Sequence, residues 1–398
     1  MTKIIAQELR KILKNDKFIN PSFTAKMLAE HHDKQFIEIF PNTLLVYDYN
    51  LIKNILKIPL FTTHEIGAGN YAKLIKIFDK AKLELLGDVL FSDAEQHAKL
   101  KDVLLKAYLQ MYEYIPELVT TTVAEHFDSL EQKESVCISN DIATPISEKI
   151  FLALAGIGTV AEFAEFTVVF NSIRLLLNAI DNNFADHTND EIVENWEFVF
   201  SKIIAKLNNP NHSYPNLLAA LQTVTSVPNE EKAIMILAFI RAGIENPRSF
   251  IVSAIIRYFA HKNLYEQNCT QFLDEVMRYD APAKITARYI SDNIELDNYQ
   301  LPKGSKVWLS FRLANFNPMV FDDPFTFKLR KPNQNLSLGY GPHFCIGKEL
   351  TYKLTMQIIN SIHSKNYKFE HPNAEYVLDE SEVFRRFIQP LYIKKQDS

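Results

Sequence analysis

Apolar residues recur at spacings of three and four along most of the chain, which is the periodicity of helices that bury one face. Helices are therefore predicted over residues 1–35, with an interruption near Pro21, over 51–58, from Asp93 onward, through most of 143–221, and over 230–259. The last of these would be a central helix about 45 Å long at 1.5 Å per residue. The pattern is that of a mainly α protein.

Alternating apolar residues predict only a minor share of strand. Residues 36–49 are rich in Ile, Phe, Leu, Val and Tyr on either side of Pro41-Asn42, which favours a hairpin. A second strand region spans residues 288–309 and contains the turn signal Pro302-Lys-Gly304. Residues 61–90 contain Gly67 and Gly69 in a polar context and are expected to form a loop.

Composition limits the classes of function. The 398 residues are 47% hydrophobic and 23% charged, and no linker, repeat or low-complexity tract divides them, so residues 1–398 are expected to form a single domain. The net charge of −5 gives no indication of nucleic-acid binding. No stretch approaches the roughly 18 apolar residues of a membrane span, and three scattered cysteines fit a reducing compartment. A soluble, cytoplasmic protein is expected.

One short stretch concentrates unusual residues. Three of only ten glycines fall between Leu336 and Gly347, around Cys345. A helical pattern follows, carried by Leu350, Leu354, Ile358 and Ile362. Cys345 is thus expected where a loop enters a helix N-terminus, and the exposed N–H groups there favour a thiolate. A thiolate suits a metal ligand.

Residue chemistry alone leaves several roles open for Cys345. Zinc is disfavoured because Cys137 and Cys269 are far away in sequence and no paired-cysteine motif exists. A nucleophile would need a partner base, which His343 could supply. An inert, buried cysteine is the third alternative.

The stretch Leu338-Gly-Tyr-Gly-Pro-His-Phe-Cys-Ile-Gly347 resembles the haem-binding loop of the cytochrome P450 family, Phe-Gly-x-Gly-x-His/Arg-x-Cys-x-Gly. Every position matches except the leading aromatic, here Leu338. The resemblance implies that Cys345 is the axial thiolate ligand of a haem iron and that His343 reaches a haem propionate. It also implies the mainly α fold with minor β-sheets of that family, in which haem b (iron protoporphyrin IX) lies between the long central helix and the helix after the cysteine loop.

Two further positions resemble the propionate-binding residues of the family. His97 and Lys101 are four residues apart and share a helical face, which from periodicity alone is more typical of a solvated polar stripe. In the family, Asp-x-x-x-His-x-x-x-Arg begins the corresponding helix, so the resemblance implies that both bind haem propionates, with Lys101 where arginine is usual. Arg288 aligns with the family arginine that binds a haem propionate.

The central helix contains Ala242-Gly-Ile-Glu-Asn-Pro247, although a mid-helix Gly and Pro are unfavourable by about 1 and 3 kcal/mol. The helix should open or kink at Pro247, or break into two shorter helices. The family carries an oxygen-binding groove here, with the pattern Ala-Gly-x-Glu/Asp-Thr-Thr, and this chain has Asn246 and Pro247 in place of the threonines. An amide does not readily relay a proton. Glu245, water or a polar group of the substrate is expected to do so, with Glu245 and Asn246 as the catalytic residues.

Glu275 and Arg278 have the i, i+3 spacing of an ordinary surface ion pair. The resemblance instead makes them the buried Glu-x-x-Arg of the family, which a later arginine usually completes. Here the matching segment is Asp323-Pro-Phe-Thr-Phe327, with Thr326 in the arginine's place. The third member is therefore missing or comes from elsewhere.

The resemblance implies a bacterial-type monooxygenase that inserts one oxygen atom from dioxygen into a small apolar organic substrate. Electrons would come from a ferredoxin and ferredoxin reductase, because the chain has no flavin or iron–sulfur segment. The alternatives are a peroxide-driven or oxidative-coupling haem enzyme, and a non-catalytic haem or ligand-binding protein. Substrate contacts are expected within residues 61–90, 165–220 and 283–286 and at Phe387 and Ile388.

A possible docking site for the electron donor follows from charge. The segment from Lys328 to Lys348 also contains Arg330 and Lys331 but no acidic residue. A basic patch that binds an acidic ferredoxin is one interpretation, and a solvated patch without function is the other.

Overall fold

The structure is a computed structural model, and it describes residues 34–63, 89, 92–158, 189–209, 214–296, 299–370 and 390–396. The chain divides into two compact units. Unit 1 comprises residues 1–61, 123–146 and 246–398, and unit 2 comprises residues 62–122 and 147–245. The expectation of a single domain remains a prediction. The helix expected over residues 1–35 lies almost entirely outside the described residues, and so do residues 64–88 of the expected loop. The substrate contacts expected at residues 165–188, Phe387 and Ile388 also lie outside them.

Unit 1 contains a five-stranded sheet in the order β1-β2-β8-β5-β3, with only β2 and β8 parallel among its first four strands. Its strands are β1 Phe36–Phe40, β2 Thr43–Val46, β3 Phe61–Thr62, β5 Ile285–Ile290 and β8 Lys306–Ser310. The predicted hairpin is confirmed as β1 and β2, which pair Phe36 with Val46 around a turn where Asn42 has φ 58°. Asparagine tolerates this left-handed conformation better than most residues.

Smaller elements complete the β structure of unit 1. The strands β4 Val136–Cys137, β10 Tyr392–Lys395 and β9 Tyr367–Phe369 form a three-stranded sheet, and β6 Ile294–Leu296 pairs with β7 Tyr299–Leu301. A π-helical turn, η1 Ile138–Ala143, follows β4 directly.

The short helix α3 Tyr49–Ile55 matches the helix expected over residues 51–58. The Asp48 side chain caps it by accepting a hydrogen bond from the Leu51 N–H at 2.8 Å. The buried side of the helix packs into a core shared with the five-stranded sheet and with Leu336. The helix therefore joins the sheet to the start of the cysteine loop.

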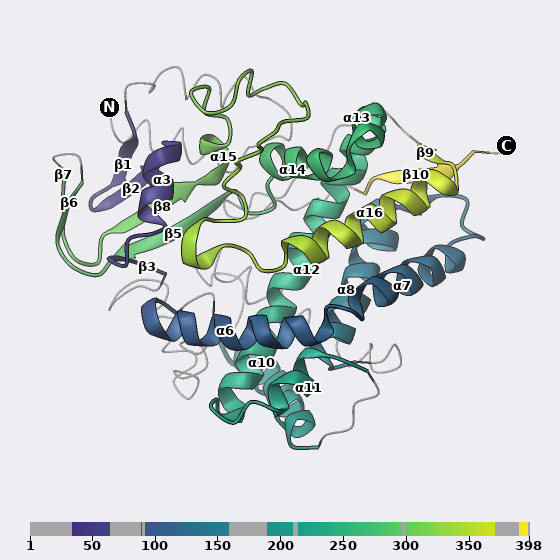
Figure 1. The fold of residues 1–398 in the computed structure, drawn as a ribbon, viewed down its shortest axis with the longest axis horizontal. Coiled ribbons are helices and arrows are strands. Elements are labelled where there is room, and N and C mark those ends of the chain that lie inside the picture. The colour runs from purple at the N-terminus through teal and green to yellow at the C-terminus, as the bar shows by residue number, and fades with distance from the viewer. Residues whose placement is uncertain are drawn as a thin grey trace. The chain divides into compact units, whose positions relative to one another are not determined.

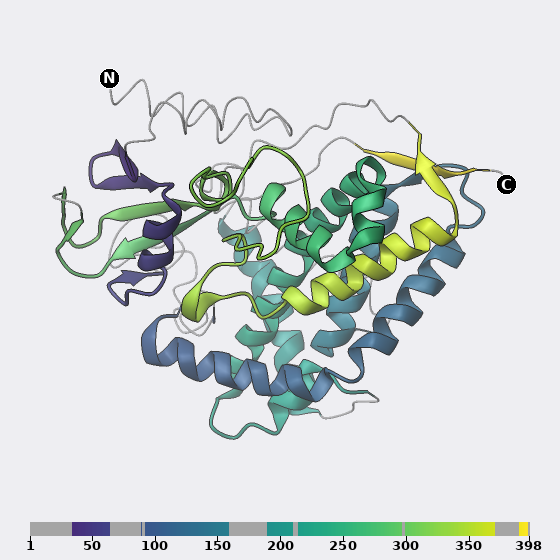
Figure 2. The same ribbon diagram turned by 45° about the horizontal axis from the view of Figure 1, so that its top comes forward.

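Unit 1 contains further helical elements, one of them within the cysteine loop and one directly after it. They are α13 Lys262–Gln267, α14 Cys269–Tyr279, α15 Phe311–Ala314, the 3₁₀ turn η2 Gly341–His343 and α16 Lys348–Ser364. Figures 1 and 2 show the yellow-green loop leading directly into α16, which confirms the predicted helix after Gly347.

In the described residues of unit 2, the regular secondary structure is helical apart from Thr62 at the end of β3. Its helices are α6 Ala94–Met111, most of α8 Thr144–Ala155, α10 Asn189–Asn208 and α11 Leu217–Gln222. The helix expected from Asp93 is confirmed as α6, although the Asp93 carboxylate does not cap it and instead accepts from the Thr63 N–H at 2.8 Å. The Gln222 side chain joins α11 to α10 by donating to the Leu207 carbonyl at 2.8 Å.

Besides α8, two further described helices contain residues of both units, α7 Ile115–Ser129 and α12 Asn229–Ala260. The latter confirms the predicted long central helix to within one residue at each end. It continues through Pro247, so a break into two shorter helices is wrong. A local opening at Pro247 remains a prediction. Among the described residues, no helix combines the length and the apolar character that crossing a membrane requires.

Candidate haem site

The cysteine loop, residues 336–347, owes its shape to two glycines in the left-handed region. Gly339 has φ 75° and Gly341 has φ 69°, a conformation that costs other residues about 1–2 kcal/mol. A Cβ on Gly341 would also lie 3.2 Å from the Leu56 carbonyl oxygen at the end of α3. The loop therefore approaches α3 more closely than a side chain at this position would allow.

Aromatic and polar contacts strengthen the attachment to α3. The Tyr49 hydroxyl donates to the Gln334 carbonyl at 2.6 Å. Lys53 and Lys57 place their Nζ atoms 4.7 and 4.9 Å from the centre of the Tyr340 ring, which is cation–π geometry. The entry of the loop is thus fixed to a helix that the sheet supports.

Cys345 lies at the exit of this loop. Its N–H donates to the Leu338 carbonyl at 2.9 Å, which closes the loop across its own base. The residue is exposed and forms no disulfide, so an inert buried cysteine is excluded. The first helical residue of α16 is Lys348, three positions later. An exposed thiol beside a helix N-terminus has the position that favours a thiolate.

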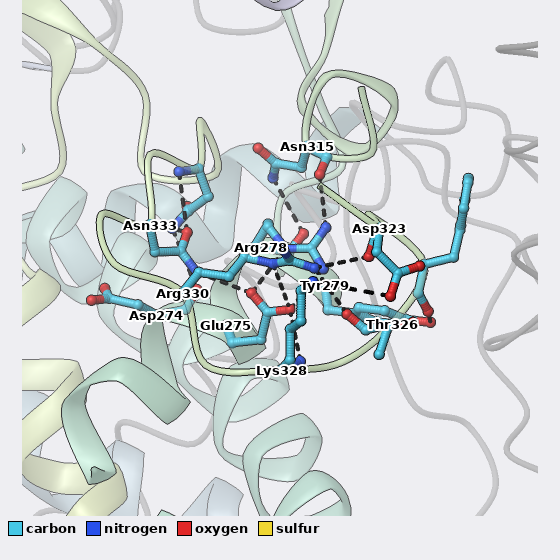
Figure 3. A network of polar contacts seen from close by, with 12 residues as sticks. Asp274, Glu275, Arg278, Tyr279, Asn315, Asp323, Thr326, Lys328, Arg330 and Asn333 are labelled. Atoms are coloured by element: carbon cyan, nitrogen blue, oxygen red, sulfur yellow. Dashed lines mark hydrogen bonds and ion pairs between the residues drawn. The ribbon is translucent and has the colours of Figure 1, made fainter. Parts of the chain in front are cut away.

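Behind the loop lies a buried charge network (Figure 3). Glu275 and Arg278 on α14 have fully buried side chains, and the guanidinium donates from Nε to Oε2 at 2.9 Å and from Nη2 to Oε1 at 2.7 Å. The predicted buried pair is therefore confirmed, and a surface pair is wrong. Arg278 also donates to the Asn315 carbonyl at 2.8 Å.

The missing third member of this network is Arg330, which comes from a position not foreseen in the sequence. Its Nε lies 3.2 Å from Glu275 Oε1, and only 5% of its side chain is exposed. Its two other nitrogens donate to the carbonyls of Asp322, Asp323 and Thr326 (Figure 3). The Thr326 side chain is exposed and contributes only its backbone oxygen. The signal in the sequence was an arginine four residues after the expected position.

This result corrects the predicted basic patch. Arg330 is buried in the network and is not part of a docking surface. The Lys328 ammonium lies 2.7 Å from Asp322, and the Lys348 ammonium lies 2.8 Å from Asp274. The segment lacks acidic residues in sequence, but the fold supplies them from neighbouring segments.

A second buried ion pair lies close to this network. Arg257, near the end of α12, donates to both carboxylate oxygens of Asp280 at 2.6 and 3.1 Å. The Arg257 guanidinium also lies 4.6 Å from the centre of the Tyr279 ring. Arg257 and Asp280 are 23 positions apart, so no local sequence pattern could have indicated this pair.

The residues predicted to bind propionates are found in both units. Arg288 is buried on β5, where it donates to the Ala287 carbonyl at 2.8 Å, and His343 is half-buried in η2. In unit 2, His97 on α6 is only 3% exposed, so a solvated stripe is wrong for this residue. Lys101, one turn further along α6, is half-buried. Their joint binding of one haem remains a prediction.

The central helix presents one open face at the proposed oxygen-binding segment. From residue 232 to 247 the side chains are buried except at Phe239, Ala242 and Asn246. These three positions follow i, i+3, i+7 spacing and share one helical face. Asn246 thus belongs to the open face, whereas Glu245 is only 9% exposed.

Gly243 has a packing role that explains its position in the helix. A Cβ at this residue would collide with the ring of Phe151 on α8. Glycine allows α8 and α12 to approach closely, because the ring occupies the space a side chain would fill. The cost of a mid-helix glycine is therefore offset by contact within unit 2.

Comparison with known proteins identifies the family. The family description "Cytochrome P450" matches residues 269–390, the segment from α14 through the cysteine loop and α16. The chain belongs to the cytochrome P450 superfamily. Members of this superfamily bind haem b, which is the cofactor of this P450.

Individual relatives match different lengths of this P450. The steroid C26-monooxygenase of Mycolicibacterium smegmatis is 31% identical over 140 residues, which cover 34% of this chain and only 33% of that protein. The biotin biosynthesis cytochrome P450 of Bacillus subtilis is 24% identical over 291 residues, covering 69% of this chain and 71% of the relative. A crystal structure of a myxobacterial cytochrome P450 in complex with myristic acid has a TM-score of 0.83 at 18% identity and covers 98% of this chain and 99% of its own. The predicted mainly α fold with small sheets is confirmed.

The described residues fit a haem bound through sulfur. A single exposed cysteine supplies one soft ligand, which is the axial ligand that this superfamily uses. Glycine at the two left-handed positions, Gly339 and Gly341, keeps side chains away from this part of the loop. A Cβ at Gly347 would make only an ordinary contact with the sulfur, 3.8 Å from Cys345 Sγ. The donor chemistry and the shape of the loop therefore agree with the cofactor of the superfamily.

Proposed function

We propose that this P450 is a cytoplasmic haem-thiolate monooxygenase that inserts one oxygen atom of dioxygen into a small apolar organic substrate. The second oxygen atom leaves as water, with two electrons from a ferredoxin-type partner and two protons from solvent. The observation that carries the proposal is the exposed Cys345 thiol at the start of α16, held by the glycine loop and supported by the buried Glu275 network.

When bound, the haem supplies the activation of dioxygen. The chain supplies the environment, and Cys345 is its anionic ligand. Arg288, His343, His97 and Lys101 are the proposed cations for the two propionates. Burial of Arg288 and His97 favours this role, because a hydrogen bond or ion pair to a propionate is stronger when it is shielded from water.

Proton delivery is assigned to residues on and beside the open face of α12. The Asn246 amide lies on that face and can donate a hydrogen bond, but it does not readily pass a proton on. Glu245 is buried beside it and is proposed to work through ordered water or through a polar group of the substrate.

The test is the absorption spectrum of the reduced carbonyl complex. Cys345→Ser is expected to keep the fold but to lose the thiolate-type spectrum, because serine cannot supply the same soft anionic ligand. Wild-type protein is the matched reference, and circular dichroism checks the fold of both. An unchanged spectrum in the variant would refute Cys345 as the ligand.

A second function is favoured by one observation, the absence of a hydroxyl at Asn246 on the open face of α12. Such a site suits an oxidant that already carries its protons, so peroxide-driven oxidation is the alternative. Product formation with ferredoxin, reductase and dioxygen is compared with product formation from hydrogen peroxide alone. Turnover only with peroxide would replace the first proposal by the second.

A further inference from the structure

Asp274 on α14 receives two hydrogen bonds from the helix that follows Cys345. The Lys348 ammonium donates to Asp274 Oδ1 at 2.8 Å, and the Tyr352 hydroxyl donates to the same oxygen at 3.0 Å. Lys348 is the first residue of α16, and Tyr352 lies one turn later. One carboxylate therefore holds the first two turns of the helix at whose N-terminus Cys345 lies.

The same stretch of α14 also holds the entry of the cysteine loop. The Asn335 side chain donates to the Asp274 carbonyl at 3.4 Å, and the Ser337 hydroxyl donates to the Met277 carbonyl at 2.7 Å. The entry and the exit of the loop are thus attached to consecutive turns of one helix. Movement of α14 relative to either end would change the position of the thiol.

Tyr352 makes this attachment rigid. Its side chain is 4% exposed, and its ring stacks on Phe250 of α12 with 5.5 Å between the ring centres and an interplanar angle of 5°. The Lys348 ammonium lies 5.0 Å from the centre of the same ring. Burial raises the pKa of Tyr352 well above its usual value, and the neighbouring Asp274 and Cys345 raise it further. The hydroxyl therefore stays protonated and donates to Asp274.

We propose that Asp274 is a positioning residue for the haem ligand, and that it acts on Cys345 through Lys348 and Tyr352. This inference rests on the proposed role of Cys345 as the axial thiolate. The carboxylate also neutralises the Lys348 ammonium three residues from the thiolate. Lys348 thereby serves the cysteine loop rather than a docking surface.

The central experiment compares Asp274→Ala with Tyr352→Phe in the haem-loaded protein. Tyr352→Phe removes only the hydroxyl and retains the ring that stacks on Phe250, so it is the variant expected to fold without difficulty. Haem loss to an excess of apomyoglobin is expected to be roughly tenfold faster in both variants, the lower end of the effect of outer-shell partners on metal affinity. Part of the reduced carbonyl complex is also expected to shift from the thiolate-type to the thiol-type spectrum.

Two matched controls separate positioning from general charge or stability effects. Asp274→Glu keeps the carboxylate and should recover at least part of the wild-type spectrum. Glu349 is next to Lys348 in sequence, but its carboxylate pairs with Lys353 along α16 at 2.9 Å. Glu349→Gln therefore removes a nearby carboxylate outside the proposed attachment and should behave as wild type. Wild-type haem loss and spectra in both Asp274→Ala and Tyr352→Phe, or an equal effect of Glu349→Gln, would overturn the proposal.

Cys345→Ser is measured in parallel, to distinguish the two ways in which the inference could fail. If that variant keeps the thiolate-type spectrum, Cys345 is not the ligand and the role of Asp274 falls with it. If Cys345→Ser loses the thiolate-type spectrum while the Asp274 and Tyr352 variants behave as wild type, only the role of Asp274 is refuted.

Discussion

At the scale of single residues, the departure from the family pattern at Asn246 gains meaning from its surroundings. Glu245 and Asn246 are adjacent in sequence, but the structure gives them different environments. Asn246 is on the open face of α12 with Phe239 and Ala242, while Glu245 is buried. The residue that replaces the threonine is thus the more exposed of the two proposed catalytic residues.

This arrangement predicts the outcome of Asn246→Thr. A threonine hydroxyl both accepts and donates a proton, so the variant should convert a larger share of the supplied electrons into product and release less hydrogen peroxide. Product and peroxide are measured per electron pair with dioxygen and a ferredoxin system. Peroxide-driven turnover, which does not need this proton delivery, should change little.

Asn246→Ala provides the matched comparison, because it removes the amide without adding a hydroxyl. If Asn246→Thr changes both routes equally, Asn246 positions the substrate instead of controlling protons. If neither route responds to either variant, the residue has no part in the reaction.

At the scale of elements, Arg330 shows what a motif comparison overlooks. A buried carboxylate such as that of Glu275 is costly unless its charge is paired and its oxygens accept hydrogen bonds. A donor in addition to Arg278 therefore stabilises it, from whichever part of the chain that donor comes. The fold provides it from the 322–330 loop, whose carbonyls of Asp322, Asp323 and Thr326 accept the remaining hydrogen bonds of the guanidinium. The requirement is for a guanidinium in space rather than at a fixed sequence position.

Arg330→Ala is therefore expected to destabilise the protein by about 2–3 kcal/mol, less than the roughly 3–5 kcal/mol of a fully broken buried pair because Glu275 keeps Arg278. Arg330→Lys should recover only part of this, since a single ammonium cannot replace the planar fork. Denaturant unfolding gives the change in free energy, and haem content is measured on the same samples.

Lys328→Ala is the matched control for the same loop. Its ammonium pairs with Asp322 at the surface, so its loss should cost at most about 1 kcal/mol. Equal destabilisation by Lys328→Ala and Arg330→Ala would contradict the assignment of Arg330 to the buried network.

At the scale of the whole molecule, the sequence predicted features that depend on local pattern. The hairpin at β1 and β2, the start of α6, the extent of α12 and the cysteine loop before α16 are all encoded by periodicity, turn residues or a contiguous motif. Long-range pairs were not predictable in this way. Arg257 with Asp280, and Asp274 with Lys348, join residues 23 and 74 positions apart.

The apparent basic patch illustrates the same limit. Charge along the sequence indicated a surface for a redox partner, but folding brings Glu275 and Asp322 against its cations. Net charge along a segment describes a surface only when the residues are exposed and their spatial neighbours are known. Binding of the proposed electron donor should therefore be tested at surface residues other than Arg330.

Stability against acid is a property of the whole molecule to which His261 contributes in a defined direction. This residue follows α12, and its ring stacks on Phe327 with 4.7 Å between centres and an angle of 14°. Burial lowers the pKa of His261 below its usual value of 6.5, and the neighbouring Arg257 lowers it further, while Asp280 opposes the shift. The folded protein thus binds the proton less readily than the unfolded chain.

The sign of the pH effect follows from this difference. Below pH 6.5 the unfolded chain takes up a proton at His261 that the folded protein resists, so the free energy of unfolding falls as the pH decreases. The loss continues until the pH reaches the lowered pKa of the folded state. From about one unit above pH 6.5, both states are almost entirely neutral at this residue, and its contribution no longer changes.

His261→Phe is expected to remove this part of the acid sensitivity, because phenylalanine can retain the stack on Phe327 but cannot titrate. Denaturant unfolding of the wild type and the variant is measured from pH 7.5 to pH 5 at about half-unit steps. Other titrating groups act on both proteins alike, so the difference between the two curves isolates His261. That difference should level off toward pH 7.5 and should change in favour of the variant as the pH falls through 6.5. A constant difference over the whole range would show that the ring titrates equally in the folded and unfolded states.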